Sequence, residues 1–288
     1  MSADTDTARW MACARAAETE RADAIIRDPF AAALAGPAGA QLWHASADAA
    51  TRAMIVRSIA VRTAVLDELI LERVNHEGVD LVLNLAAGLD TRAWRLALPP
   101  ALRWVDVDRS ALLAHKVVHL ERQPPACRYR ALTADLSNAS DRARVLAECA
   151  DSSAALVVTE GFLVYLSAEQ VAALAQALHG APAVQWWLTD LAGPRALELL
   201  QRVWGPVMRG AAFQFAPADS ARFFAPLGWR EVAFRASRDE AQRLGRATPL
   251  PWSARLALWC ASAAWREEFR RLSGCALLAR AAADCGRA

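Results

Sequence analysis

The chain has 288 residues, 55% of them hydrophobic, which is enough to bury a core that hides about 75% of the unfolded surface. This composition excludes a disordered chain, a collagen and a small disulfide scaffold. The formal charge is only +2 and the charges are interleaved, so the sequence shows no basic face of the kind that binds nucleic acid. Of the 33 basic residues, Lys116 is the one lysine, and alanine occurs 67 times. We interpret both biases as codon usage in a GC-rich genome.

Cysteine spacing and hydropathy favour a cytoplasmic protein. The six cysteines are scattered and include no C-x-x-C pair, which predicts reduced thiols and no zinc or redox site. The first seven residues lack the apolar segment of a signal peptide. The longest uncharged run, 170–189, is interrupted by Gly180 and Pro182, so it predicts a buried helix and a buried strand and not a membrane span. His115 and His119 lack the intervening glutamate of a zinc protease motif, and we expect no metal.

Helical patterns dominate the first 78 residues. We predict helices at 6–26, 29–35 and 48–74, which form an amino-terminal helical cap over residues 1–78.

From residue 79 to residue 192, apolar runs of strand length alternate with helical patterns, which is typical of a parallel sheet covered by helices. The predicted strands are 81–85, 103–107, 129–132, 155–159 and 184–188, and the predicted helices are 91–98, 110–122, 140–149 and 168–178. The first and fourth strands are almost wholly apolar, so we place them at the centre of the sheet. We interpret 79–192 as a cofactor-binding core.

The last third of the chain completes the predicted fold. Residues 193–225 carry three prolines and predict an irregular lid or insertion. The final segment, 226–288, contributes strands at 229–234 and 275–279 that pair near one edge of the sheet. We therefore predict a single α/β domain with a doubly wound, mostly parallel sheet and an antiparallel edge strand.

The segment most informative about function is 84–92, where a buried strand breaks into a turn of small residues and reopens as a helix. In doubly wound sheets a nucleotide-like ligand approaches the backbone at this turn. Asp108 ends the next strand, 20 residues after Gly88. An acidic residue at that spacing binds ribose hydroxyls. The segment therefore predicts a ribose-containing cofactor.

The turn is not a G-x-G-x-x-G motif, because Ala86, Ala87 and Asp90 stand where a dinucleotide site has glycine. A pyrophosphate on a helix amino terminus demands the closest approach to the backbone. S-adenosylmethionine has ribose and adenine but no phosphate, which relaxes that demand. The turn therefore favours a methyltransferase, with a dinucleotide-dependent oxidoreductase as the alternative.

Three blocks resemble the conserved blocks of the leucine carboxyl methyltransferase family: NLAAGLDTR at 84–92, VDVD at 105–108 and TEGFLVYL at 159–166. Shorter blocks are similar to its bacterial branch of S-adenosylmethionine-dependent O-methyltransferases, many of them linked to polyketide or other secondary metabolism. These are ER at 20–21, RDPF at 27–30, VRT at 61–63 and SGCALL at 273–278. The resemblance implies a Rossmann-like class I methyltransferase fold and S-adenosyl-L-methionine as the cofactor.

The resemblance also implies roles for individual residues. Arg27 and Arg62 would hold the carboxylate of the cofactor's methionine half, since an arginine fork binds a carboxylate through two charge-assisted bonds. Ala86 and Gly88 would pass close to the methionine backbone. Asp108 would bind the ribose diol.

Four more residues complete the predicted site. Asp135 resembles the family position beside the adenine amine, with Leu136 over the ring; an aspartate that caps the following helix is an equal alternative. Glu160 ends the fourth strand and would face the cofactor's amino group or an arginine of the family blocks. Tyr165 is a candidate for lining the acceptor pocket, with packing as the alternative.

The methyl acceptor stays open at this point. An ionised carboxylate needs no general base, whereas a hydroxyl would gain from one. The bacterial likeness favours a small-molecule acceptor, such as a secondary metabolite, over a protein carboxyl terminus. We expect no nucleic-acid or membrane partner, and the sequence does not fix the oligomeric state. A catalytically silent relative that binds a metabolite or a protein is a third hypothesis.

Overall fold

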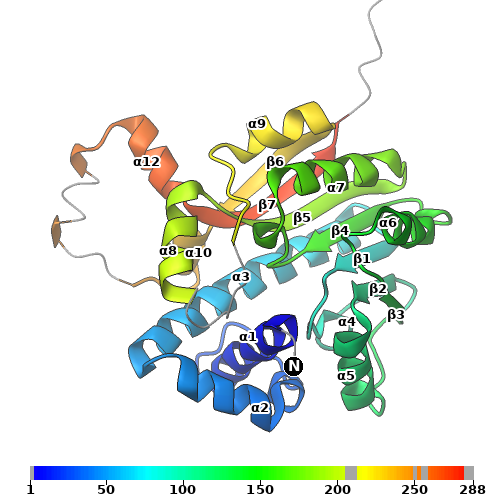
Figure 1. Ribbon diagram of the computed structural model, residues 1–288, viewed down its shortest axis with the longest axis horizontal. Coiled ribbons are helices and arrows are strands. Elements are labelled where there is room, and N and C mark those ends of the chain that lie inside the picture. The colour runs from blue at the N-terminus through cyan, green and yellow to red at the C-terminus, as the bar shows by residue number, and fades with distance from the viewer. Residues whose placement is uncertain (1–2, 205–212, 249–251, 254–258, 282–288) are drawn as a thin grey trace, which may run out of the picture.

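The computed structural model describes residues 3–204, 213–248, 252–253 and 259–281. Seven strands form one sheet in the order β3-β2-β1-β4-β5-β7-β6, with helices on both faces (Figure 1). The strands are β1 Leu81–Leu85, β2 Arg103–Asp108, β3 Arg128–Thr133, β4 Ala155–Thr159, β5 Val184–Ala192, β6 Trp229–Ala236 and β7 Ser273–Arg280. Neighbours from β3 to β5 are parallel, and β7 lies between β5 and β6, antiparallel to both. The predicted fold class is confirmed, and β1 and β4 lie at the centre with the predicted bounds.

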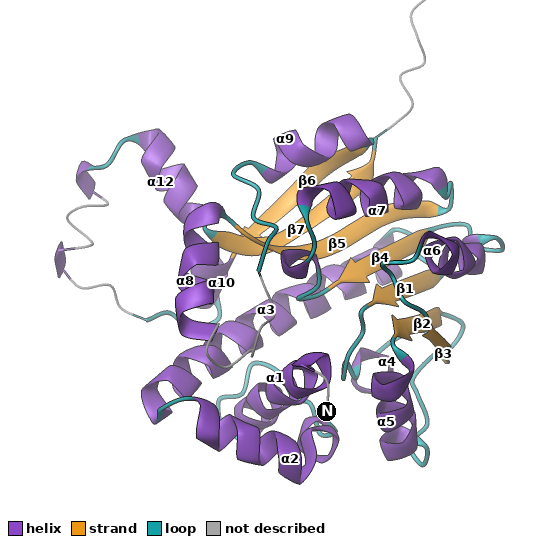
Figure 2. Ribbon diagram, in the orientation of Figure 1, coloured by secondary structure: helices purple, strands orange, loops and turns teal. Residues whose placement is uncertain are grey.

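The helices largely follow the prediction. They are α1 Ala3–Thr19, α2 Ala31–Ser46, α3 Ala49–His76, α4 Arg92–Arg95, α5 Ser110–Leu120, α6 Ala139–Leu146, α7 Ala168–Gly180, α8 Pro194–Trp204, α9 Ser220–Phe224, α10 Ser237–Arg243 and α12 Ala263–Arg270, with short 3-10 turns η1 Ala147–Cys149, η2 Leu163–Tyr165 and η3 Ala225–Leu227. Figure 2 shows them on both sides of the orange sheet.

Several of these predictions are wrong in extent. The helix predicted at 29–35 is longer, because α2 continues past a kink at Gly36 to Ser46. The first helix ends at Thr19 and not at residue 26, because Glu18 and Thr19 accept backbone N–H groups from the loop that follows. The helix predicted at 91–98 is only the four residues of α4, since Leu96 is already extended. The segment 193–225 was expected to be irregular, yet it begins with the helix α8.

Each face of the sheet packs against its own set of helices, because successive strand residues point to opposite faces. Leu83 and Val157 belong to a buried cluster with α6, α7 and α9. Val82 and Val158, one position away, belong to a second cluster with α3 and α4. The strands at the centre are therefore apolar on both sides, as their sequences indicate.

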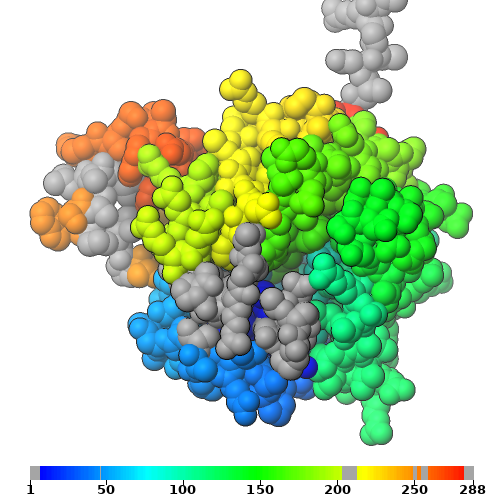
Figure 3. Space-filling view, in the orientation of Figure 1, coloured from blue at the N-terminus to red at the C-terminus, as the bar shows by residue number. Residues whose placement is uncertain are grey.

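The amino-terminal helices form a third cluster around Trp10, Leu34 and Ile59. This cluster also includes Leu89 from the β1–α4 turn and Leu112 from α5. Figure 3 shows these helices in blue along the lower side of the molecule, next to the blue-green segment that follows β2. The cap thus contacts the turn that carries the predicted chemistry. The division of the chain into a cap, core, lid and final strands stays a prediction.

The described residues contain neither a membrane-spanning helix nor a cluster of metal ligands. No helix in them is long and apolar enough to cross a membrane. The same residues hold no group of three or more histidine, cysteine or acidic side chains placed to bind a metal ion.

Candidate active site

A cavity of about 740 Å³ lies where the carboxyl ends of β1, β2, β4 and β5 meet α1, α3 and α8. Ligand sites in doubly wound sheets occupy this edge, and pockets of about 300–1,000 Å³ suit small molecules. Every predicted site residue except Arg27 lines the cavity: Arg62, Ala86, Gly88, Asp108, Asp135, Leu136, Glu160 and Tyr165. The prediction that these residues come together agrees with the geometry, whereas their individual roles stay predictions.

The β1–α4 turn presents backbone to the cavity. Ala86 and Gly88 both have left-handed backbone, with φ of 54° and 52°. The N–H of Asp90 donates to the Ala87 carbonyl at 3.0 Å, which closes the turn. Left-handed backbone is costly for alanine, so neighbouring groups must hold this conformation. With no side chain larger than a methyl group at 86–88, a ligand can approach the main chain closely.

Asp108 lies beside this turn, half-buried at the end of β2. One carboxylate oxygen accepts the Gly88 N–H at 2.7 Å, and the other accepts the Arg109 N–H at 2.7 Å. Burial raises the pKa of Asp108, although these two backbone donors oppose the effect. Each oxygen keeps a lone pair for a further donor. The side chain is therefore fixed in place and still able to accept hydroxyl groups.

Asp135 and Leu136 line the same end of the cavity. Asp135 is exposed and accepts both the backbone N–H and the hydroxyl of Ser137, at 2.9 and 2.7 Å, which lowers its pKa. The helix α6 is capped by Asn138 and not by Asp135. The capping alternative for Asp135 is therefore wrong, and its carboxylate instead stabilises a local turn.

Glu160 lies at the end of β4 between two arginines. Its carboxylate accepts Arg62 Nε at 2.9 Å and Arg92 Nη1 at 2.7 Å. Burial alone would raise the pKa of Glu160, but the two guanidinium groups lower it to about 2. Arg62 Nη1 also donates to Asp190 at 3.0 Å, and Asp190 accepts the Gly161 N–H at 2.6 Å. Glu160 thus meets a family-block arginine, one of the two partners expected for it.

Arg92 connects this cluster to the rest of the molecule. Its buried guanidinium donates to Asp67 of α3 at 2.6 Å and to Asp90 of the turn at 2.6 Å, in addition to Glu160. Arg95 reaches the same Asp67 at 2.6 and 2.8 Å. The turn, the end of β4 and helix α3 are therefore held together by one buried ion network.

Arg27 does not reach the cavity, which corrects the expected placement. Its side chain is exposed and donates to the Thr19 carbonyl at 3.3 Å, on the outside of the α1–α2 connection. The next residue, Asp28, turns inward and accepts Arg15 Nε at 2.8 Å. Arg15 lines the cavity and donates to the Leu89 carbonyl at 2.7 Å.

Sequence reasoning missed two further residues at this end. Arg15 shares a helical face with Ala8 and Met11, and their spacing of three and four residues was the signal available for it. Asp190 was missed because the strand was predicted to stop at residue 188, whereas β5 continues to Ala192.

The other end of the cavity is apolar. Tyr165 and Phe213 pack with ring centroids 5.4 Å apart. Met54 of α3 and Leu199 of α8 line the cavity although they are 44% and 60% exposed. Exposed apolar side chains at a cavity mouth indicate a surface that contacts a ligand or partner.

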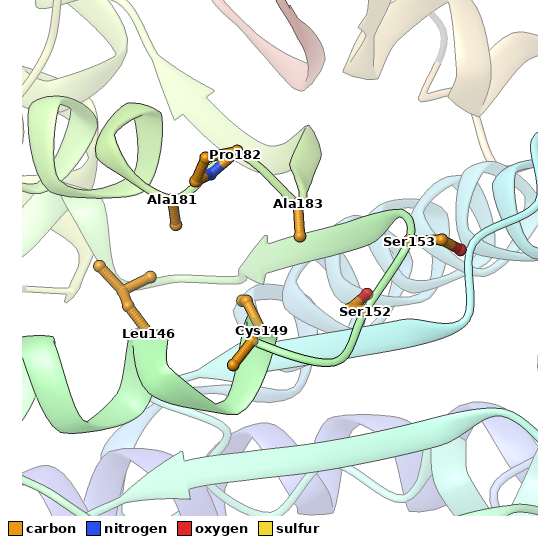
Figure 4. Close-up of a pocket in the computed structure, with 8 residues that line it drawn as sticks. Leu146, Cys149, Ser152, Ser153, Ala181, Pro182 and Ala183 are labelled. Carbon is orange, nitrogen blue, oxygen red and sulfur yellow. The ribbon is translucent and has the colours of Figure 1, made fainter.

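A second hollow of about 450 Å³ lies at the opposite edge of the sheet, before β4 and β5 begin. Figure 4 shows it between Leu146, Cys149 and the segment that contains Ala181 and Pro182. Cys149 is its one titratable group among the described lining residues, and burial raises the pKa of that thiol to about 11. This hollow offers little for catalysis.

Comparison with known proteins identifies the family. The sequence profile of the leucine carboxyl methyltransferase family matches residues 8–179, more than half of the chain. The chain belongs to the leucine carboxyl methyltransferase family. This membership confirms the predicted enzyme class, a methyltransferase that depends on S-adenosyl-L-methionine.

Several curated relatives of this family member come from bacteria. A protein of Streptomyces coelicolor, named as a candidate S-adenosyl-L-methionine-dependent methyltransferase, is 31% identical over 253 residues, which cover 83% of this chain and 87% of the relative. A similarly named protein of Frankia alni is 31% identical over 252 residues, with the same coverage. A relative from Mycobacterium marinum is 36% identical over 177 residues, a match that spans 56% of this chain and 55% of the relative. These comparisons give the oxidoreductase alternative no support.

Solved structures agree with the fold of this methyltransferase. A candidate methyltransferase from Thermobifida fusca has a TM-score of 0.56 at 19% identity and covers 85% of this chain and 89% of its own. A DUF574 family protein from Streptomyces avermitilis has a TM-score of 0.58 at 13% identity, over 85% of this chain and 91% of its own. At such identities the likeness shows the fold alone.

Proposed function

We propose that this methyltransferase acts on oxygen: it transfers a methyl group from S-adenosyl-L-methionine to a carboxylate or hydroxyl of a small molecule, such as a secondary metabolite. The observation that carries the proposal is a cavity that joins a polar end beside Gly88 and Asp108 to an apolar end beside α8. The two ends suit a cofactor and an acceptor that differ in polarity.

The residues at the polar end fit the cofactor. The fixed carboxylate of Asp108 has acceptor positions left for the ribose diol, and Asp135 and Leu136 are available for adenine. Arg62 Nη2 makes no hydrogen bond to a described residue, so it can donate to the methionine carboxylate. Arg15 Nη1 is available in the same way and takes the role first expected of Arg27. Glu160 and Asp190 are suited to the cofactor's ammonium group.

Bound S-adenosylmethionine supplies a methyl group on a positively charged sulfur, so alignment of the acceptor and exclusion of water are the tasks of the chain. Helices α1 and α3 wall the cavity on one side and α8 on the other. The aromatic rings of Tyr165 and Phe213, with Met54 and Leu199, support an acceptor with an apolar body.

The reacting group of the acceptor is a carboxylate or a hydroxyl, and the pH dependence of the rate separates the two. A carboxylate acceptor is ionised across the neutral range, so its rate stays flat from about pH 6 to pH 9. A hydroxyl acceptor needs a proton removed, so its rate rises with pH.

The described cysteines are free thiols, which supports the proposed cytoplasmic location.

Titration calorimetry with S-adenosyl-L-methionine and with its demethylated product tests the cofactor part of the proposal. Heat of binding from both is expected, and absence of binding at millimolar cofactor contradicts it. A methyl-transfer assay with tritiated cofactor against a metabolite extract, followed by mass identification of the product, tests the acceptor part. Cofactor binding without any labelled product would favour the catalytically silent relative.

A further inference from the structure

Lys116 is the one lysine in a chain with 33 basic residues, and codon usage does not explain its location. The side chain is fully buried, with 0% of its surface exposed. It lies on α5 beneath the β1–α4 turn, and its ammonium group has two partners. Nζ donates to Asp106 Oδ2 at 2.6 Å and to the Asp90 carbonyl at 2.9 Å.

Both partners of Lys116 belong to the structure that supports the cofactor end of the cavity. Asp106 is the residue two before Asp108 on β2 and is 1% exposed. Its other carboxylate oxygen accepts Asn84 Nδ2 and Trp104 Nε1, each at 2.9 Å. Asp90 is the last residue of the β1–α4 turn, and its own N–H donates to the Ala87 carbonyl to close that turn. Lys116 therefore connects the strand that carries Asp108 to the turn that carries Gly88.

The turn needs such support because Ala86 has left-handed backbone, which is costly for a residue with a Cβ atom. A strained backbone persists only where its surroundings determine it. The Gly88 N–H must also stay within 2.7 Å of the Asp108 carboxylate. A small shift between the turn and β2 would break this bond and move both groups relative to a bound ribose.

The chemistry of lysine suits this position better than that of arginine. An ammonium group is compact and directs its three donors apart, so it can reach a carboxylate and a carbonyl on different elements. A guanidinium group is planar and larger, and the enclosed space around Nζ has no exposed surface through which it could extend. Replacement by arginine would thus force the turn and β2 apart.

We infer that Lys116 is a positioning residue for the cofactor site, which sets the β1–α4 turn against β2 so that Gly88 and Asp108 face the same ligand. The inference rests on the proposed roles of Gly88 and Asp108. It assigns Lys116 no contact with the cofactor or the acceptor.

The test compares cofactor affinity with stability in three variants: Lys116→Arg, Lys116→Met, and Lys116→Met combined with Asp106→Asn. The double variant leaves no buried charge unpaired, so it keeps the test valid if Lys116→Met does not fold. Affinity for S-adenosyl-L-homocysteine is measured by calorimetry under conditions where urea titration shows that each protein is folded.

We expect folded Lys116→Arg and the folded double variant to bind S-adenosyl-L-homocysteine at least fivefold more weakly than the wild type. A residue with only a structural role would lower stability and leave the affinity of the folded protein unchanged, and that result would overturn the inference. Arg280→Met is the matched control, because Arg280 bonds three carbonyls at the opposite edge of the sheet. Its affinity should equal that of the wild type.

Asp108→Ala in the same experiment separates failure of the inference from failure of the assigned site. If Asp108→Ala weakens binding and the Lys116 variants do not, positioning by Lys116 is refuted alone. If none of these variants changes affinity, the cofactor lies elsewhere in the cavity, and the roles of Gly88 and Asp108 are refuted as well.

Discussion

The two ends of the cavity are held by different interactions. At the cofactor end, Glu160 and Asp190 each accept two or more hydrogen bonds, and the guanidinium of Arg92 is only 2% exposed. At the acceptor end, Met54 and Leu199 are apolar and exposed. Buried charges keep one geometry because any displacement leaves a charge unpaired, whereas methionine and leucine side chains can repack. The cofactor end thus suits one constant ligand, and the acceptor end can vary with the substrate.

The largest effect should come from the ion network at the cofactor end. Arg92→Met leaves Glu160, Asp90 and Asp67 without a shared buried partner, and loss of one partner from a buried pair costs about 3–5 kcal/mol. We therefore expect Arg92→Met to lower the free energy of unfolding, which urea denaturation of the wild type and of the variant measures.

The matched control is Arg270→Met, which removes an exposed ion pair with Glu267. Exposed pairs contribute about 0–1 kcal/mol, so this variant should stay close to the wild type. Equal losses in the two variants would contradict the stabilising role of the buried network at the cofactor end.

Acid should weaken the same network. The pKa of Glu160 is about 2 in the folded protein and has an ordinary value of 4.5, so its ionisation stabilises the fold above about pH 4.5. This contribution, on the order of 3 kcal/mol, is lost as the pH falls from about 4.5 towards 2. Unfolding free energies of wild type and Glu160→Gln, measured from pH 7 to pH 3, should converge as the pH falls. A constant difference over that range would show that Glu160 is not ionised through this network. Glu121→Gln, at an exposed position, should follow the wild type throughout.

Removal of a single ligand contact should have a smaller effect. Asp108→Ala loses the predicted bonds to the ribose diol, and we expect cofactor affinity to fall at least tenfold, about 1.4 kcal/mol. Calorimetry with S-adenosyl-L-methionine measures the change. Asp151→Ala, an exposed residue in the turn before β4, serves as the control and should bind normally. Unchanged affinity in Asp108→Ala would remove the ribose role from this residue.

The smallest effect should come from the acceptor end. Leu199→Glu places a charge on the apolar wall of the cavity. We expect the acceptor to lose about 1 kcal/mol of apolar contact energy, which lowers kcat/KM for the acceptor about fivefold. Cofactor affinity should not change, because Leu199 lies on α8, away from the turn. Val118→Glu changes another exposed apolar residue, on α5 and outside the cavity. It should leave both kcat/KM for the acceptor and the affinity for the cofactor unchanged. A rise in activity with Leu199→Glu would indicate an acceptor with a positive charge.

The same contrast explains how far the sequence could predict the structure. Gly88, Asp108 and Glu160 follow or end strands, and strand ends are evident from local hydropathy. Arg15 reaches the cavity only because α1 docks against the β1–α4 turn, a tertiary contact without a local signal beyond helical spacing. The family motif around Arg27 located the correct connection, but Asp28 is the residue that points inward.

Helix α8 was missed for a different physical reason. The prolines in 193–225 suggested irregular structure, yet Pro194 occupies the first position of α8, where a proline costs no helical hydrogen bond. Pro194 therefore marks a helix boundary, whereas the three prolines together had suggested an irregular lid or insertion over the whole segment. The burial of Lys116 was equally out of reach, because composition counts residues without placing them.

The position of β7 has a consequence for biosynthesis. This strand comes after β6 in the chain but pairs between β5 and β6, and residues 273–275 at its start line the cavity. During synthesis, the edge of β5 from Trp186 to Ala192 therefore stays unpaired until β7 has left the ribosome and inserted. An unpaired edge of that length can pair with other nascent chains. The strand that completes the cavity is thus also the one that covers this edge of β5 in the growing polypeptide.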